Sequence, residues 1–174
     1  VALLSKLPFE ESVNGLPGEG EDSHARFIDA LVVAPIGALR VCCLYLPNGN
    51  PPDTEKYTYK INWMKRLSKL ARARMIEEIP LVLAGDFNVI PDARDVHDPK
   101  AWAGDALFLP QTRARFHALE HLGLTDAVRA CSDEAGLYTF WDYQAGAWQK
   151  NNGIRIDHLL LSPEAANRFR SAAI

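Results

Sequence analysis

The stretch Leu81-Val-Leu-Ala-Gly-Asp-Phe-Asn88 predicts the centre of the fold. It opens with four consecutive apolar residues closed by Gly85, a pattern typical of a short strand buried within a sheet. Ligand sites of α/β sheets favour the carboxyl ends of strands, which is where Asp86 and Asn88 stand. In an extended chain these two side chains point the same way, and Phe87 points the other way. A carboxylate beside an amide suits a hard cation or a phosphate, and the alternative is an ordinary Asx turn.

Apolar periodicity on both sides of this strand predicts one domain, 1–174, of α/β or α+β class with mixed sheets. We expect strands at 27–34, 39–46, 81–84, 138–143 and 154–161, the first two forming a hairpin around Pro35-Ile-Gly37. We expect helices at 56–77, at 111–122 and from the Ser162 cap to about 169. The basic residues of the first helix, Lys60 among them, are expected mostly on its solvated side, and the acidic segment 10–26 is expected to be a surface loop.

Composition excludes several classes of protein. The 174 residues are 48% hydrophobic and 24% charged, with 11 Gly and 11 Pro, which fits a globular domain and excludes disordered or collagen-like chains. No apolar run approaches the ~18 residues of a membrane span. The net charge of −3 does not by itself indicate a nucleic-acid partner, so such a partner must be argued from a site. Cys42, Cys43 and Cys131 form no disulfide framework and are expected to be buried apolar side chains in a reducing compartment.

Both ends of the sequence suggest that it continues further. Residues 1–4 start inside what looks like a buried strand, and residues 171–174 stop directly after a helix. We therefore expect the chain to be part of a longer protein.

Asp157 and His158 are neighbours and invite a catalytic-dyad interpretation. Strand alternation opposes it, because it places Arg155 and Asp157 on one face and Ile156 and His158 on the other. Asp157 could then orient some other imidazole, and His158 is expected to be half-buried and structural.

The segment His117-Ala-Leu-Glu-His121 matches the H-x-x-E-H pattern of inverted zinc proteases. Phe116 and Leu119 mark the buried face of this helix, so the two histidines and Glu120 are expected on the opposite, solvated side. No third ligand is placed by spacing, and a structural interpretation is favoured.

Six segments, in order and covering nearly the whole chain, resemble the exodeoxyribonuclease III branch of the endonuclease/exonuclease/phosphatase superfamily. They are Tyr45-Leu-Pro-Asn-Gly49, Gly85-Asp-Phe-Asn-Val-Ile-Pro91, Phe108-Leu-Pro-Gln-Thr-Arg113, Gly123-Leu-Thr-Asp126, Tyr138-Thr-Phe-Trp-Asp-Tyr143 and Gly153-Ile-Arg-Ile-Asp157. The first part of the second segment, G-D-x-N, is shared across the superfamily, whereas the last two segments are more particular to the abasic-site nucleases.

The resemblance implies a four-layer sandwich, in which two packed mixed β-sheets are flanked by helices, and which is incomplete in this chain. It also implies a DNA repair nuclease that depends on Mg²⁺, with Mn²⁺ as the alternative cation. Such an enzyme hydrolyses phosphodiester bonds at abasic sites and removes nucleotides from 3′ ends of duplex DNA. The resemblance further leads us to expect a monomer without membrane contact, located in the bacterial cytoplasm near the nucleoid.

The resemblance also assigns roles to residues. Asp86 would position or activate the attacking water, and Asn88 would hold the scissile phosphate; both would help to bind the metal. Tyr45 would polarise the phosphate and Asn48 would contact it. Asp157 would orient a catalytic histidine.

Phe140, Ile154 and Ile156 match positions that line the pocket for a flipped-out abasic sugar, and Trp141 is assigned to substrate binding with them. A tight apolar pocket selects a baseless nucleotide, because such a nucleotide leaves the stack at least cost.

The family's first strand, its metal-binding Glu and its closing S-D-H-x-P segment have no counterpart in the sequence, so we expect the 174 residues alone to be inactive. Two alternatives remain open. One is a relative that acts on lipid or inositol phosphates, and the other is a non-catalytic DNA-binding relative.

Overall fold

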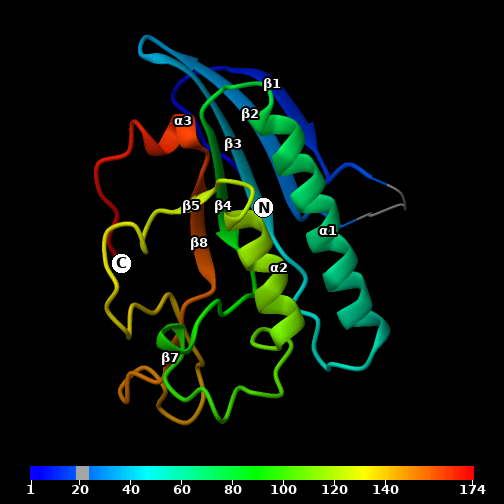
Figure 1. Cartoon of the computed structure of the whole chain (residues 1–174), viewed down its shortest axis with the longest axis vertical. Helices are drawn as coiled ribbons and strands as arrows, with labels where there is room; N and C mark the ends of the chain where they lie inside the picture. The colour runs from blue at the N-terminus through cyan, green and yellow to red at the C-terminus, as the bar shows by residue number, and fades with distance from the viewer. Residues whose placement is uncertain (19–23) are drawn as a thin grey trace.

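A six-stranded mixed sheet is the largest element of the protein (Figure 1). The structure, a computed structural model, describes residues 1–18 and 24–174. The strands run in the order β1-β2-β3-β4-β8-β5, with the bounds β1 Phe9–Asn14, β2 Phe27–Ala34, β3 Gly37–Tyr45, β4 Leu81–Asp86, β8 Asp157–Leu161 and β5 Thr125–Asp126. A second, two-stranded antiparallel sheet is formed by β6 (Phe140–Trp141) and β7 (Gly153–Ile154).

Two helices, α1 (Glu55–Met75) and α2 (Pro110–Glu120), lie side by side over one face of the large sheet (Figure 1). A short helix, α3 (Pro163–Ala166), follows β8, and a 3₁₀ turn covers Ala93–Asp95. The predicted mixed α/β class is confirmed, with one multi-stranded mixed sheet, a second sheet and helices.

The core lies between these helices and the sheet. Leu44 of β3 and Leu83 of β4 are fully buried in one cluster with Trp63 and Leu67 of α1. Burial of this apolar surface stabilises the arrangement by roughly 25 cal/mol per Å². The packing holds β3 and β4 against a rigid helical layer. It therefore also fixes the positions of the residues at which these two strands end.

Most predicted elements are confirmed. β2 has the predicted bounds, and it pairs with β3 as an antiparallel hairpin closed at Ala34 and Gly37. β4 is a central strand between β3 and β8. The helices predicted at 56–77 and 111–122 are α1 and α2, each shifted by one or two residues.

Four predictions about segments are wrong. Part of the expected loop 10–26 is the strand β1. All of its residues are exposed, and as an edge strand with only one neighbour it needs no apolar alternation. Residues 19–23 of that loop lie outside the described residues. Residues 1–4 form no strand, because β1 already occupies the outer edge of β2, and Leu4 is 99% exposed. The strand expected at 138–143 shortens to β6, and the one expected at 154–161 is divided into β7 and β8.

The three cysteines are free, as expected, but their burial differs. Cys42 is buried in the core and Cys43 is half-buried, whereas Cys131 is exposed, which corrects the expectation for that residue. In the described part of the chain, no helix combines the length and apolarity needed to cross a membrane.

Candidate active site

Three neighbouring strands bring predicted site residues into one row. Tyr45 and Asp86 are register partners in the parallel pair β3–β4, and Asp86 and Asp157 are register partners in the antiparallel pair β4–β8. Partners on adjacent strands project from the same face of a sheet at a separation of about 5 Å. Tyr45 and Asp157 are exposed and Asp86 is half-buried between them.

Gly85 allows this row to form. Its φ is +138°, a conformation that side chains rarely adopt, and an added Cβ would collide with the carbonyl of Leu44 on β3. The close approach of the two backbones therefore requires glycine directly before Asp86.

After Asp86 the chain turns at once, rather than continuing as the extended segment that the sequence suggested. The N–H of Asn88 donates to Oδ1 of Asp86 at 2.7 Å, and Asn88 has a φ of +47°. This is an Asx turn, so the alternative interpretation of the motif is correct as local geometry. The turn nevertheless leaves both side chains facing one pocket, while Phe87 is fully buried against Phe116 and His158.

The Asn88 side chain links the ends of two strands. Its Nδ2 donates to the carbonyl of Leu46 at 2.8 Å, and its Oδ1 accepts from Nδ2 of Asn48 at 3.2 Å. Asn88 is only 4% exposed, so these bonds hold its amide in one orientation. The two predicted phosphate-contacting amides thus form a single unit.

A pocket of about 250 Å³ contains most of the predicted site. Its lining residues are Tyr45, Asn48, Asn50, Asp86, Asn88, Trp102, Asp105, Leu107, Phe140, Ile154 and Ile156. Apart from Asp105, its polar lining residues lie at or just after the ends of β3 and β4, whereas Phe140 and Ile154 come from β6 and β7. Asp157 does not line this pocket, although it is beside Asp86 in the sheet.

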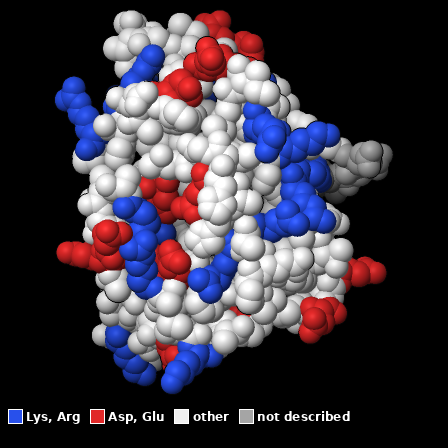
Figure 2. Space-filling view, in the orientation of Figure 1, with Lys and Arg blue, Asp and Glu red and all other residues white. Residues whose placement is uncertain are grey.

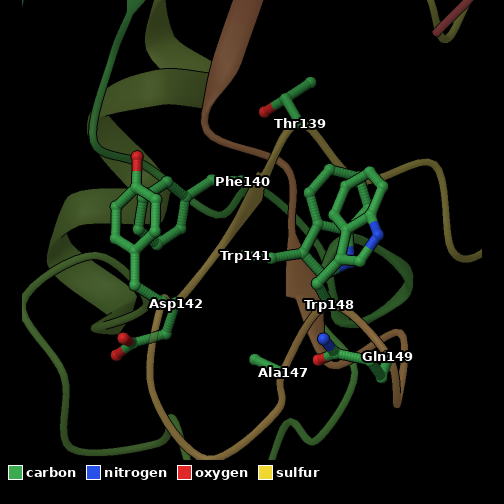
Figure 3. A pocket seen from close by; sticks show the side chains of 8 residues that line it. Thr139, Phe140, Trp141, Asp142, Ala147, Trp148 and Gln149 are labelled. Atoms are coloured by element: carbon green, nitrogen blue, oxygen red, sulfur yellow. The ribbon is translucent and has the colours of Figure 1, made fainter.

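Trp141 lies elsewhere. It lines a neighbouring open pocket of about 580 Å³, formed by residues 139–149, which it shares with Phe140 (Figure 3). Its indole packs edge-on against Trp148 with ring centroids 4.6 Å apart, and its Nε1 donates to Oδ1 of Asn151 at 3.1 Å. Of the predicted substrate residues, Trp141 therefore shares a pocket only with Phe140, and it does not line the pocket that holds Asn48, Ile154 and Ile156.

Sequence reasoning missed two polar residues of the pocket. Asn50 donates from Nδ2 to both carboxylate oxygens of Asp105, at 3.1 and 3.2 Å, and accepts from the N–H of Ala106. Asn50 belongs to a turn-rich stretch, which gave a weak signal, whereas nothing near Asp105 in the sequence indicates that it reaches the pocket.

Lys60 was expected with the solvated basic residues of α1, and this is wrong. Basic side chains do gather over α1 (Figure 2), where Lys65, Lys69 and Arg72 are exposed. Lys60 is instead fully buried, because it falls on the same helical face as Met64 and Leu67. Burial lowers the pKa of Lys60 to about 7, although the charges of Asp105 and Asp86 act to raise it.

The pKa of the Asp86 carboxyl is shifted upward in the pocket. Burial raises the pKa of this carboxyl to about 6, and the charge of Asp157 adds to the increase. The bond from Asn88 N–H and the charge of Lys60 act in the opposite direction without outweighing burial.

A second cluster of charges, around Arg155, lies in the interior. Arg155 is fully buried and binds Oδ1 of Asp95 at 2.7 Å and Oδ2 of Asp126 at 2.7 Å. Arg129 also pairs with Asp95. This corrects the prediction that Arg155 shares the face of Asp157, because the strand is interrupted at residues 155–156 and alternation ends there.

His158 belongs to this cluster and makes structural contacts, as predicted, but it is buried rather than half-buried. Its Nδ1 lies 3.1 Å from Nη1 of Arg155, and its Nε2 lies 2.9 Å from the carbonyl of Val89. Since a guanidinium has only donors and a carbonyl only accepts, the ring must be neutral with its proton on Nε2. Burial and the charge of Arg155 lower the pKa of His158 to about 4.

The H-x-x-E-H segment forms no metal site. His117 and Glu120 bind each other, with Nδ1 and Oε2 2.6 Å apart, and both are half-exposed. Within residues 1–18 and 24–174, no group of three or more His, Cys, Asp or Glu side chains is arranged to hold a metal.

The pocket nevertheless offers donors that suit Mg²⁺. This cation is commonly held by one or two carboxylates together with waters and substrate phosphate oxygens. Oδ1 of Asp86 accepts from Asn88, and its Oδ2 has no protein partner among the described residues. Asn88 Oδ1 keeps a second lone pair beside the one that accepts from Asn48.

Fold and pocket together define a class: a mixed α/β protein whose strand ends present a carboxylate and amides suited to a phosphate and a hard cation. The chain belongs to the Endonuclease/Exonuclease/phosphatase family, which matches residues 1–173. The family resemblance drawn from the sequence is thereby confirmed.

Relatives with names or solved structures are similar over nearly the whole chain. The chain is 31% identical to exodeoxyribonuclease III of Haemophilus influenzae, over 97% of this chain and 66% of that protein. The structure of a 3′ phosphatase, NExo, from Neisseria bound to a product DNA hairpin has a TM-score of 0.87 and 36% identity, over 93% of this chain and 62% of that one. An AP endonuclease from Archaeoglobus fulgidus has a TM-score of 0.85 and 31% identity, over 94% of this chain and 62% of that one. The chain spans about two thirds of the length of these relatives.

Proposed function

We propose that this protein is a Mg²⁺-dependent DNA repair nuclease of the exodeoxyribonuclease III type. It hydrolyses phosphodiester bonds at abasic sites and removes nucleotides from the 3′ ends of duplex DNA, and it acts as a monomer in the cytoplasm. The observation that carries the proposal is that Asp86, Asn88 and Asn48 line the same pocket as Phe140 and Ile154. The names of the relatives, exodeoxyribonuclease III and AP endonuclease, support the choice of substrate.

Asp86 is the residue that acts on the attacking water. A carboxylate with a pKa of about 6 is ionised at neutral pH and is a stronger base than an ordinary aspartate. It accepts a proton from water, or orients the water, at the oxygen that the Asx turn leaves free.

The amides and Tyr45 hold the phosphate. Asn48 and Tyr45 supply N–H and O–H donors for its oxygens, and the bond between Asn48 and Asn88 fixes where these donors point. Asp86 and Asn88 would hold the Mg²⁺ ion, which when bound neutralises charge that develops on the phosphoryl group. Mn²⁺ is the alternative cation for these oxygen donors.

Asp157 has the orienting role that the resemblance assigns to it. All five histidines of the chain fall within the described residues and none of them lines the pocket, so this role requires an imidazole from outside the 174 residues. We therefore keep the expectation that the 174 residues alone have little activity.

The apolar wall distinguishes the proposal from its closest alternative. Phe140, Ile154 and Ile156 line the same pocket as the acid and amides, and they offer no hydrogen-bond partners to the headgroup of an inositol phosphate. A sugar that has lost its base is small enough and apolar enough on one side to enter such a pocket, and base removal lowers the cost of leaving the duplex.

The test is incision of a duplex that carries one abasic analogue, with Mg²⁺ or with EDTA. We would compare the 174-residue chain with a chimera that adds the flanking segments of the Haemophilus relative. We expect Mg²⁺-dependent incision by the chimera, and a loss of about 10²- to 10⁴-fold in Asp86→Ala. Asp133→Ala, which changes a carboxylate that is 90% exposed, is the matched control and should leave incision unchanged.

The alternatives give different results in the same assay. Turnover of an inositol phosphate or a phospholipid without incision of DNA would replace the proposed substrate class. Tight binding of the duplex without incision by either protein would favour a non-catalytic DNA-binding relative.

A further inference from the structure

We propose that Lys60 of α1 is a positioning residue that holds the backbone of Asn48 and Asn88 and so fixes the two phosphate-contacting amides. The inference rests on the proposed function, because it assigns a purpose to the geometry of the same pocket. Lys60 does not line the pocket and touches no substrate, so it acts only through these two residues.

The contacts of Lys60 converge on the two asparagines. Its Nζ donates to the carbonyl of Asn48 at 2.9 Å and to the carbonyl of Asn88 at 2.5 Å. These two residues follow different strands, β3 and β4, and their own link is one side-chain bond of 3.2 Å. Lys60 therefore joins the backbones of two segments whose side chains meet in the pocket.

Gly49 is shaped around this lysine. A Cβ at Gly49 would lie 2.6 Å from Cδ of Lys60, and the φ of Gly49 is +88°. The turn after β3 thus passes directly over the lysine stem. The absence of a side chain at Gly49 lets the carbonyl of Asn48 reach the ammonium group.

A role in packing alone does not explain a lysine here. Lys60 is 0% exposed, and among the described residues it forms no ion pair with a carboxylate. A buried ammonium without a direct ion pair is costly, even with the charges of Asp105 and Asp86 acting in its favour, and a methionine of similar length would fill the same space without that cost. What a methionine cannot do is donate to two carbonyls at once.

Helix α1 gives the lysine a rigid base. Its neighbours on the helix, Trp63, Met64 and Leu67, are all buried in the main core. Movement of Lys60 would require movement of this packed face, so the position of its Nζ is set by the core rather than by the turn that it supports.

The test compares Lys60→Met with Lys65→Met. Lys65 lies on the same helix but is exposed, and its side chain only donates to Asn62 at 3.3 Å. The first measurement, made on the 174-residue chain in EDTA, is the pair of side-chain amide resonances of Asn48 and Asn88 in ¹H–¹⁵N NMR spectra. The second is kcat and KM for incision, measured in the chain or in the chimera, whichever incises.

We expect Lys60→Met to fold, to shift both asparagine amide resonances, and to lower kcat by about 10- to 100-fold, because a displacement of about 1 Å in a positioning group has effects of this size. KM should change much less, and Lys65→Met should match the parent protein in all three respects. Unchanged amide resonances in a folded Lys60→Met variant would overturn the inference, as would a kcat within twofold of the parent.

Two further outcomes remain decisive. If Lys60→Met does not unfold cooperatively, Lys60→Gln, whose side chain is one bond shorter and so does not reach both carbonyls as Nζ does, is measured in its place against the same criteria. If neither the chain nor the chimera incises DNA, the proposed function fails, and the amide resonances alone decide whether Lys60 holds the two asparagines.

Discussion

Asp86 in the pocket and Asp95 in the cluster around Arg155 are both largely withdrawn from water, and their pKa values move in opposite directions. Burial raises the pKa of Asp86 to about 6, since only a backbone N–H and a more distant lysine oppose it. Burial acts on Asp95 in the same way, but hydrogen bonds and charges from Arg155 and Arg129 outweigh it and lower the pKa. The comparison teaches that the arginines around Asp95 compensate a buried negative charge, whereas the pocket leaves the charge of Asp86 largely uncompensated, as the proposed role of Asp86 in binding a proton or a cation requires.

Removal of Arg155 should give the largest effect and tests whether the charge of Asp95 is compensated by this residue. Arg155→Met leaves Asp95 and Asp126 without their main partner, and loss of one member of a buried ion pair costs about 3–5 kcal/mol. We expect a fall of this size in the free energy of unfolding, measured by urea denaturation at pH 7. Arg94→Met is the matched control, because Arg94 pairs with the 90%-exposed Asp133 and should contribute no more than about 1 kcal/mol. Equal effects of the two substitutions would contradict the structural role of the cluster.

The pH dependence of stability tests whether His158, a member of the cluster around Arg155, is held neutral. Its pKa is about 4 in the folded protein and 6.5 in the unfolded chain, so between these values the unfolded chain binds more protons. The free energy of unfolding should therefore fall as the pH drops from 6.5 towards 4, by at most about 3 kcal/mol from this residue. His158→Gln has no titratable ring, so its stability should fall less over the same range in EDTA. Parallel curves for the two proteins would show that the imidazole is not held neutral.

Asp86→Asn should give the smallest change in the free energy of unfolding, and this change should be a stabilisation rather than a loss of stability. The folded state binds more protons than the unfolded chain between pH 3.8 and about 6, so the ionised carboxylate destabilises the fold above pH 6. We expect Asp86→Asn to raise the free energy of unfolding by about 1–2 kcal/mol at pH 8 in EDTA, and to lose that advantage at low pH. Asp133→Asn should change stability by less than about 0.5 kcal/mol. A less stable Asp86→Asn protein at pH 8 would mean that the carboxylate is compensated in the pocket after all.

Some parts of the site could be predicted from sequence. They are the parts where the residue type and its place on a strand determine where the side chain lies. A buried strand closed by Gly85 put Asp86 at a carboxyl end, and both Asp86 and Asn88 do line the pocket. The placement holds although the segment after Asp86 is an Asx turn rather than the extended chain that was expected, because the turn is local and leaves both side chains in the pocket.

Other parts depend on tertiary contacts that a sequence pattern does not contain. Lys60 stands at helical spacing with Met64 and Leu67, but a lysine is normally solvated, and the carbonyls that bind it come from two distant turns. Arg155 was misplaced because alternation holds only while a strand is continuous, and the strand is interrupted at residues 155–156, where Arg155 binds Asp95 and Asp126. The polar edge strand β1 carries no apolar pattern at all.

The shared row of Tyr45, Asp86 and Asp157 limits how this protein can change length during evolution. Side chains alternate along a strand, so a one-residue insertion or deletion within β3, β4 or β8 would turn the corresponding side chain to the opposite face. The loops within the long segments that connect these strands carry no such parity. Gain and loss of residues should therefore be confined to the connecting segments, and alignments of related chains should show the three strands free of gaps up to the positions of this row.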